Sequence, residues 1–191
     1  MELTDAILQR RSYHSLEPTK ITEDIIRDLA EAAKLAPSCF NNQPWRYVFV
    51  YDPEVLKKMH ATLSKGNEWA IKGSMIIAVL GKKDDDCTMK DGREYFLFDI
   101  GIATGSLILK ATDLGLVAHP IAGYDPDKVK NALNIPKDTQ VITLLIIGKH
   151  SESINSELSG KQAGSEKERP ERLPLQKFAF INTYSNKGVK K

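Results

Sequence analysis

Two periodicities alternate along the chain and predict a mixture of helices and strands. Apolar residues three or four positions apart, with start or stop signals at their ends, predict helices over residues 4–10, from Thr22 to Pro37, after Pro53, over 94–114 and after Pro126. Short apolar and β-branched runs predict strands over residues 45–51, 75–80, 117–119 and 140–147. We expect Thr4 or Asp5 near the N-cap of the first helix, and Asp125 as the cap of the helix that begins at Pro126.

The order of these elements does not give a regular series of βαβ units. We therefore expect an α+β fold, with a mixed, mostly antiparallel central sheet flanked by helices. The length is enough for a single domain over residues 1–191 and short for two. Residues 150–171 are almost free of large apolar side chains, which indicates a polar loop or lid. Apolar spacing resumes in 172–191, which we expect to be a C-terminal arm that packs on a partner subunit.

The segment 94–114 is the longest periodic stretch, and its apolar residues are distributed almost all round the helix. A helix that is apolar on most faces has to be buried on most faces. We therefore expect this helix at the centre of the fold and within the interface of a homodimer. Gly101 and Gly105 would allow a second helix to approach it closely.

Composition and charge exclude several classes of protein. Hydrophobic residues make up 41% of the chain and charged residues 27%, which is typical of a globular domain. The net charge of +2, without long runs of one sign, indicates neither a nucleic-acid groove nor a polybasic membrane patch. The N-terminus does not read as a signal peptide, and the apolar runs are too short to span a bilayer. Cys39 and Cys87 could form one disulfide, but they belong to no metal-binding pattern, so we expect a reduced, cytoplasmic protein.

The motifs of several enzyme classes are missing from the sequence. It has no strand-linked GxGxxG, no Walker A lysine loop, no HExxH and no GxSxG. The acidic run 84–86 follows two lysines in a turn, and we expect an exposed charged loop there. His60, His119 and His150 lack spaced partners, and we expect them to be packing or surface residues. No metal site is predicted.

Basic residues near both ends of the chain form the first two candidate clusters. Arg10, Arg11 and Ser12 can hold an anion, because guanidinium groups present bidentate donors that suit phosphate and the hydroxyl adds another. A solvated helix end would explain them about equally well. A second group, which includes Arg169 and Arg172, follows the polar segment, and a solvated loop is the alternative there.

Amide side chains and small residues form the remaining two clusters. The turn Asn41-Asn-Gln-Pro-Trp45 is rich in groups that carry both a donor and an acceptor, which suits the edge of a heterocycle. A single Asn could instead satisfy its own backbone in a turn, but two Asn and a Gln fit that explanation less well. The segment Pro120-Ile-Ala-Gly123 would let a ligand approach the main chain, or would merely link a strand to a helix. Together the clusters indicate a flat, nucleotide-like cofactor.

In order and spacing, the clusters resemble those of the nitroreductase family of flavin-dependent oxidoreductases, over nearly the whole chain. The resemblance rests on Arg10-Arg-Ser12, Ala36-Pro-Ser-x-x-Asn-x-Gln-Pro-Trp45, Gly66-Asn-x-Trp69, Leu114-Gly-Leu116, Pro120-Ile-Ala-Gly-Tyr-Asp125 and Arg172-Leu-Pro. It implies an intertwined homodimer with flavin mononucleotide (FMN) at the subunit interface.

The resemblance also implies roles for individual residues. Those expected to hold the phosphate and the ribityl chain are Arg10, Arg11, Ser12 and Arg172, with Arg169 as a replacement or helper. Those expected to line the flavin from the partner subunit are Pro37, Ser38 and Cys39. Those expected near the ring or the ribityl chain are Asn41, Gln43 and Asn67. The backbone expected to face flavin N5 is that of Ala122 and Gly123, and Ile121 is expected to bind the cofactor beside them.

His14 departs from the family pattern, which often has Lys or Arg two positions after the serine. A cation there would lie near flavin N1 and O2, where reduction builds negative charge. Because His is only partly charged near neutral pH, we predict a lower and more pH-dependent flavin potential than Lys would give.

The resemblance implies a ping-pong reaction. A reduced nicotinamide, NADH or NADPH, gives hydride to flavin N5 and leaves, and an acceptor such as a nitroaromatic or a quinone takes its place. No side chain is expected to act as a catalytic acid or base. The alternatives are a reductive dehalogenase or flavin-fragmenting enzyme of the same fold, a flavin-storing protein without turnover, and a structural or interaction domain.

Overall fold

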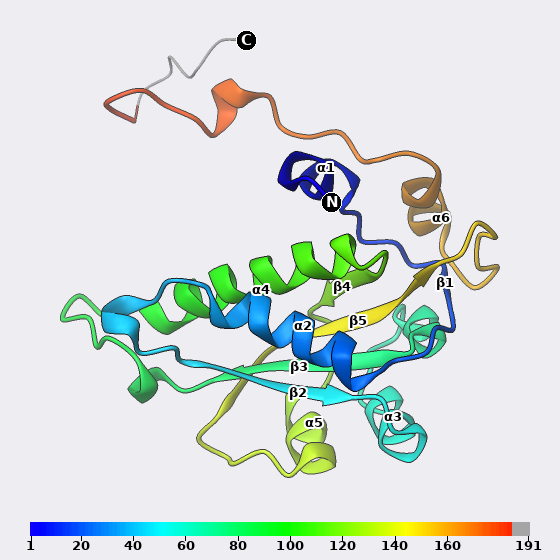
Figure 1. The fold of residues 1–191 in the computed structure, drawn as a ribbon, viewed down its shortest axis with the longest axis horizontal. Helices are drawn as coiled ribbons and strands as arrows, with labels where there is room; N and C mark the ends of the chain where they lie inside the picture. Colours follow the sequence, from blue (N-terminus) through cyan, green and yellow to red (C-terminus); the bar gives the residue numbers. More distant parts are fainter. Residues whose placement is uncertain (185–191) are drawn as a thin grey trace.

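A five-stranded sheet forms the centre of the fold in a computed structural model, which describes residues 1–184 (Figure 1). Its strands are β1 (Leu16–Glu17), β2 (Trp45–Val50), β3 (Met75–Gly81), β4 (Val117–Ile121) and β5 (Gln140–His150). Strand β5 pairs with β1, β3 and β4, and β3 pairs with β2. Every pairing among these strands is antiparallel, so the predicted α+β fold with a mostly antiparallel sheet is confirmed.

Helices cover both faces of the sheet. They are α1 (Leu3–Gln9), α2 (Glu23–Lys34), α3 (Pro53–His60), α4 (Tyr95–Asp113), α5 (Pro126–Leu133) and α6 (Gly160–Lys167). In Figure 1, α2 and α4 lie on one face and α3 and α5 on the other. Side chains cap α2, α3 and α5 at their starts, and Asp125 is the cap of α5 as predicted. Thr4 and Asp5 lie in the first turn of α1, near its N-cap as expected, but the N-cap is Glu2 and its side chain makes no capping hydrogen bond.

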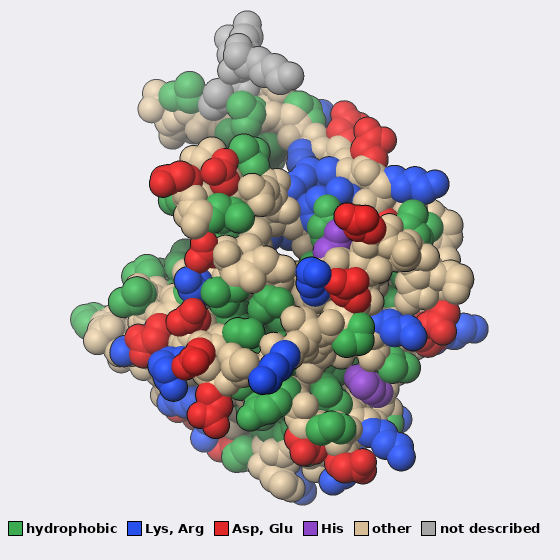
Figure 2. Space-filling model, turned by 45° about the vertical axis from the view of Figure 1, so that its right-hand side comes forward, with side chains coloured by type: hydrophobic (Ala, Val, Ile, Leu, Met, Phe, Trp, Pro, Cys, Tyr) green, Lys and Arg blue, Asp and Glu red, His purple; other side chains and the backbone are tan. Residues whose placement is uncertain are grey.

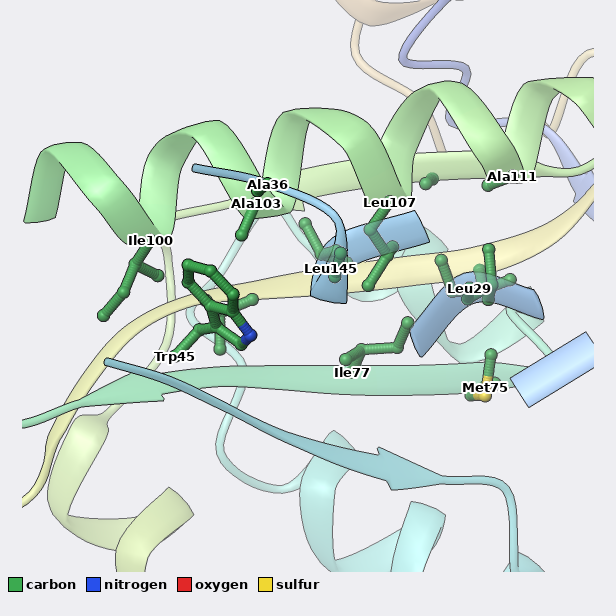
Figure 3. Packing of buried hydrophobic residues seen from close by; sticks show 14 of the residues in the cluster. Leu29, Ala36, Trp45, Met75, Ile77, Ile100, Ala103, Leu107, Ala111 and Leu145 are labelled. Carbon is green, nitrogen blue, oxygen red and sulfur yellow. The ribbon is translucent and has the colours of Figure 1, made fainter. Parts of the chain in front are cut away.

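The strand β3 explains how one sheet supports two hydrophobic layers. Successive side chains of a strand point to opposite faces, and every residue of β3 is buried. Ile77 belongs to the layer under α2 and α4, which Figure 3 shows with Leu29 and Leu107 packed beside it. Ile76 belongs to the opposite layer, together with Met59 of α3. The sheet therefore holds its helices on both sides by burial of apolar surface.

Helix α4 has the bounds that the sequence predicts, but it is not buried on all sides. Ile100 and Leu107 face the sheet and are almost inaccessible, whereas Phe98 is 58% exposed. By length and composition alone α4 could cross a membrane, which differs from the expectation that every apolar run is too short. Its packing on the sheet and on α2 is that of a core helix.

The two cysteines form a disulfide, which corrects the expectation of a reduced protein. The register of β2 against β3 explains how they meet. Trp45 at the start of β2 pairs with Gly81 at the end of β3, so the segments before 45 and after 81 leave the sheet at the same end. Cys39 lies in the first segment and Cys87 in the second.

The C-terminal part of the chain contains one helix that the sequence pattern does not predict. Helix α6 lies within the polar segment 150–171 and starts with a capping box between Ser159 and Gln162. After α6 the chain runs past α1 and away from the sheet (Figure 1). The end of the predicted arm, residues 185–191, lies outside the described residues.

Candidate functional site

Basic residues from both ends of the chain line one cavity of about 300 Å³. Its lining includes the predicted residues Arg10, Arg11, Ser12, His14, Arg169 and Arg172, together with His119. The short segment between α1 and β1 supplies the first four, and the chain after α6 supplies Arg169 and Arg172. Figure 2 shows Lys and Arg side chains gathered beside a hollow on this face, with a histidine next to them.

The guanidinium groups of this cavity repel one another. Burial lowers the pKa of Arg10, and the charges of Arg169 and Arg172 lower it further. Within residues 1–184, none of these three arginines forms an ion pair with a carboxylate. Arg169 is held by the backbone, because its Nη2 donates to the carbonyl oxygens of Leu8 at 2.5 Å and Arg10 at 2.9 Å. A cluster of unpaired cations that the fold holds in place is suited to an anionic ligand.

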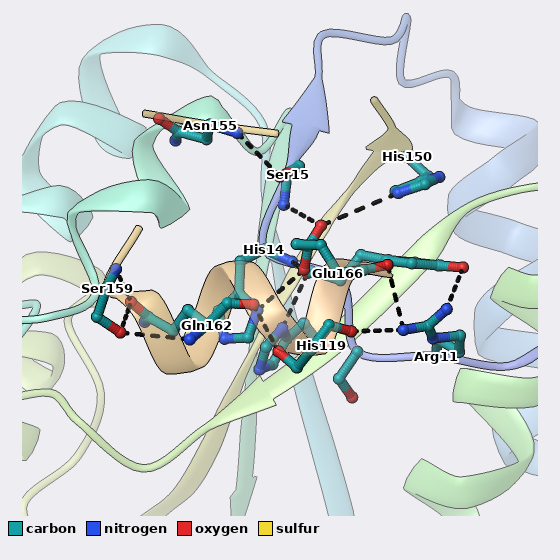
Figure 4. Close-up of polar contacts among 12 residues, drawn as sticks. Arg11, His14, Ser15, His119, His150, Asn155, Ser159, Gln162 and Glu166 are labelled. Carbon is teal, nitrogen blue, oxygen red and sulfur yellow. Dashed lines mark hydrogen bonds and ion pairs between the residues drawn. The ribbon is translucent and has the colours of Figure 1, made fainter. Parts of the chain in front are cut away.

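Arg11 fixes helix α6 against the N-terminal segment. Its Nη2 donates to the carbonyl oxygens of Ser165 and Glu166, and the distance to Glu166 is 3.3 Å. Its guanidinium also lies over the ring of Tyr13, 4.5 Å from the centroid. Figure 4 shows these contacts from the side of the helix. Arg11 thus uses both terminal nitrogens on protein groups. Arg169 uses only Nη2 in this way, so its other donors, with those of Arg10 and Arg172, are left for a ligand.

Glu166 of α6 is the main partner of the segment that carries His14. Its carboxylate is 7% exposed and accepts hydrogen bonds from His14 N at 2.8 Å and Ser15 N at 3.0 Å. The His14 Nδ1 lies 3.2 Å from Glu166 Oε1. Burial would raise the pKa of Glu166, but these hydrogen bonds lower it below its usual value on balance. The sequence analysis did not nominate Glu166, because nothing in a charge-rich segment distinguishes one buried glutamate from exposed ones.

His119 of β4 is a further residue of the cavity that the sequence analysis assigned to packing. Its ring packs against those of Trp69 and His14, with centroids 4.6 Å away in each case. Its Nδ1 lies 2.9 Å from the carbonyl oxygen of Tyr13, which requires a proton on that nitrogen. Burial lowers the pKa of His119 to about 4, although the bond to Tyr13 opposes the shift. His119 therefore presents a neutral ring beside the arginines.

The depressed pKa of His119 predicts a loss of stability in acid. Unfolding restores the ordinary pKa of about 6.5 to His119. Between about pH 6.5 and pH 4 the unfolded chain therefore binds a proton at His119 that the folded chain does not, and stability falls. We expect this residue to remove about 2 kcal/mol of unfolding free energy between pH 7 and pH 5. His119→Gln should remove that part of the pH dependence in denaturant titrations at both pH values. An unchanged pH dependence of stability in His119→Gln would contradict this assignment.

A second predicted pair lies near His119. Asn67 Nδ2 donates to the carbonyl oxygen of Gly123 at 2.9 Å, which joins the loop before Trp69 to the segment after β4. A Cβ atom at position 123 would lie 2.3 Å from Asn67 Nδ2, so a side chain there would displace the amide from this hydrogen bond. Gln162 of α6 reaches the same loop by donating to the carbonyl oxygen of Gly66 at 3.1 Å. The predicted residues at 67 and 121–123 therefore occupy one region beside the cavity of the arginines.

The amide-rich turn lies in another part of the subunit. Within the described chain, none of the predicted residues of this turn lines the cavity: Pro37, Ser38, Cys39, Asn41 and Gln43. The turn comes directly before Trp45, at the end of the sheet opposite β1. Its residues form hydrogen bonds mainly with one another and with α4. One subunit alone therefore brings together three of the four predicted clusters, and the amide-rich turn is the exception.

A larger cavity of about 900 Å³ opens next to α6. It shares His14, Ser165 and Arg169 with the cavity of the arginines, and α6 supplies much of the remaining wall. The two spaces are therefore adjacent. Their combined size is enough for a ligand with an anionic end and a wider apolar or aromatic part.

The fold and the cavity define an α+β protein with a cationic ligand site built from both ends of its chain. The family model described as the nitroreductase family matches residues 7–74 and 64–149, and the chain belongs to the nitroreductase family. The predicted resemblance is thereby confirmed.

Relatives of known sequence and structure extend over most of the chain. Protein DrgA of Synechocystis sp. is 27% identical over 212 residues, which cover 95% of this chain and 96% of that protein. MhqN of Bacillus subtilis, provisionally named an NAD(P)H nitroreductase, is 28% identical over 183 residues. The match covers 78% of this chain and 88% of MhqN. A crystal structure described as an oxidoreductase containing FMN has a TM-score of 0.81 at 29% identity, and covers 94% of this chain and 91% of its own.

Proposed function

We propose that this protein is an FMN-dependent oxidoreductase that takes hydride from NADH or NADPH and passes it to an electron-poor acceptor such as a nitroaromatic or a quinone. The observation that carries the proposal is the cluster of Arg10, Arg169 and Arg172, which has no carboxylate partner within residues 1–184. A structural relative described as containing FMN and a sequence relative named for NAD(P)H support the same assignment.

The donor set fits the phosphate end of FMN. Three guanidinium groups and the hydroxyl of Ser12 surround a small cavity, and their mutual repulsion would be relieved by an anion. Arg10 Nη1 already lies 3.3 Å from Ser12 Oγ, so the two donors point to one region. At Gly123 the lack of a Cβ leaves room for the amide of Asn67, which donates to the Gly123 carbonyl oxygen and fixes this segment.

Bound FMN would supply a ring that accepts and donates hydride; the protein binds and orients it. His14 lies at the junction of the two cavities. The carboxylate of Glu166 accepts a hydrogen bond from the backbone N–H of His14 and faces the Nδ1 of the His14 ring. With Nδ1 committed to Glu166, the other ring nitrogen of His14 is the one free to meet a ligand. No side chain is assigned as acid or base.

The proposal includes a homodimer in which the amide-rich turn of one subunit completes the site of the other. Exposed apolar side chains on three elements favour this: Leu3 and Ile7 of α1, Phe98 of α4, and Phe178 and Ile181 of the C-terminal arm. A Cβ at Gly101 or Gly105 would meet nothing within 4 Å, so that face of α4 is open to a second helix. Light scattering on the eluting protein should give the mass of a dimer.

The visible spectrum of purified protein, supplemented with FMN and then desalted, tests the proposal. We expect a retained flavin spectrum that bleaches when NADPH or NADH is added without oxygen and returns when a quinone or nitroaromatic follows. A retained flavin that neither nucleotide bleaches would favour a storage protein over an enzyme. A colourless protein would contradict the assignment of the arginine cluster to FMN.

A further inference from the structure

The Cys39–Cys87 disulfide connects two loops that the sheet already places together. Cys39 begins the amide-rich turn, and Cys87 lies in the loop between β3 and α4. The pairing of Trp45 with Gly81 brings these loops to one end of the sheet without help from the sulfurs. The disulfide therefore acts on the conformation of the loops and not on the strand pairing. Both cysteines are only partly buried, so a small molecule can reach them.

The turn that starts at Cys39 has an unfavourable backbone. Its residues with a left-handed conformation are Phe40 (φ 48°), Asn41 (φ 60°) and Gln43 (φ 51°). Residues other than glycine rarely adopt this backbone conformation, and it persists only where the surrounding structure holds it. Two hydrogen bonds contribute, from Cys39 N to Asp99 Oδ2 at 2.7 Å and from Gln43 N to Ser38 Oγ at 2.9 Å. The disulfide is the one covalent link at the turn among the described residues.

The groups around the sulfurs distinguish the two cysteines. Asn42 Nδ2 lies 3.7 Å from Cys87 Sγ and donates to Asp86 Oδ1 at 3.2 Å. The carboxylate of Asp86 lies within 4.8 Å of both sulfurs and disfavours negative charge on either of them. The amide of Asn42 faces Cys87 alone and stabilises negative charge there, so Cys87 is the better leaving group. Asp86 is only 7% exposed, and its Oδ2 has no hydrogen-bond partner among the described residues. Burial raises the pKa of Asp99, and the nearby carboxylate of Asp86 raises it further, so the loop before Cys87 is coupled to the carboxylate that accepts from Cys39 N.

We propose that Cys39–Cys87 is a thiol–disulfide exchange site, whose reductant is a low-molecular-weight thiol or dithiol, and that its oxidised form fixes the amide-rich turn. The thiolate of the reductant attacks Cys39 Sγ, the bond between the two protein sulfurs breaks, and Cys87 leaves as a thiolate that takes a proton. A second thiol of the reductant then attacks the mixed disulfide and releases Cys39 as a thiol. Two electrons reach the protein, and the reductant leaves as its own disulfide.

The consequence for ligand binding rests on the proposed function, in which the turn lines the flavin of the partner subunit. A turn that is already fixed loses less conformational freedom on binding than one that must be ordered first. Opening the disulfide should therefore weaken FMN binding by roughly tenfold, while the arginine cluster stays unchanged.

The experiment compares the full-length protein in three forms: oxidised, reduced with dithiothreitol under native conditions, and as the variant Cys87→Ser. Cys87 is chosen because it is outside the residues assigned to the flavin. Thr88→Ser is the matched control, since it changes the same loop and keeps the disulfide. Two quantities are measured for each form, the dissociation constant of FMN and the rate of amide hydrogen exchange at residues 39–43.

We expect the reduced protein and Cys87→Ser to exchange these amides faster and to bind FMN about tenfold more weakly than the oxidised protein and Thr88→Ser. Equal FMN affinity and equal exchange in all forms would overturn the inference and leave the proposed function standing. Failure of every form to bind FMN would overturn the proposed function, and the exchange rates would then decide the inference alone. A disulfide that dithiothreitol does not open in the folded protein would also overturn it.

Discussion

Replacing Arg10 by alanine is expected to weaken FMN binding by about 10- to 100-fold, because a hydrogen bond to a charged group contributes about 1.5–3 kcal/mol. Arg10 is partly buried, as is Arg169, and the pKa of Arg10 is lowered by burial and then by Arg169 and Arg172. A phosphate would offset both effects. The loss should be measured by fluorescence titration of flavin-free protein, and it should shrink as ionic strength rises.

The control for Arg10→Ala is Arg27→Ala, which removes the same side chain from the exposed face of α2. Arg27 is paired with Asp24 at 2.9 Å and touches no cavity. An unchanged dissociation constant for Arg10→Ala would refute the placement of the phosphate. Arg172→Ala should behave like Arg10→Ala with a smaller effect, since Arg172 is exposed. Arg169→Ala should also lower stability, because Arg169 bonds the carbonyls of Leu8 and Arg10.

Glu166→Ala is expected to lower the free energy of unfolding by about 3 kcal/mol, since it leaves two backbone donors unpaired at roughly 1–3 kcal/mol each. The donors are the N–H groups of His14 and Ser15, and Ser15 is 1% exposed, so water replaces the carboxylate poorly. Denaturant titration at neutral pH gives the total loss. Amide exchange at positions 14 and 15 should locate it.

The pH dependence of this contribution has a definite sign. The folded pKa of Glu166 is below its usual value, so its stabilisation is present above about pH 4.5 and is lost as pH falls through the folded pKa. Glu166→Gln should therefore differ most from the native protein at neutral pH. Glu168→Ala, two positions later on the exposed side, is the control and should change stability by less than about 0.5 kcal/mol. Equal losses for Glu166→Ala and Glu168→Ala would contradict the assigned role.

The sequence predicts the regular elements well where one physical signal dominates. The uninterrupted apolar run of β3 indicates a strand buried on both faces, and the structure buries it completely. Thr22 starts α2 as expected, with its Oγ1 accepting from Ile25 N. Helix α6 was missed because its sequence has two glycines and no apolar face, although Ser159 and Gln162 form a recognisable capping box.

The candidate site was predictable only in part, because much of it depends on contacts distant in sequence. The arginine cluster could be proposed from residue type, since guanidinium groups near both ends suit one anion. His119 and Glu166 could not, because only the packing of β4 and α6 around His14 makes them neighbours. The disulfide depends in the same way on the register of β2 against β3, which the sequence pattern does not specify.

The bonds from Arg169 to the carbonyls of Leu8 and Arg10 span 161 and 159 positions of the chain. During synthesis the N-terminal segment leaves the ribosome long before residue 169, so the carbonyls of Leu8 and Arg10 lack their guanidinium donor until Arg169 emerges. The sheet and its helices can form earlier, because their contacts are complete by the end of β5. The cavity of the arginines is thus the last part of the subunit to be assembled. Ligand binding therefore follows the folding of the rest of the subunit.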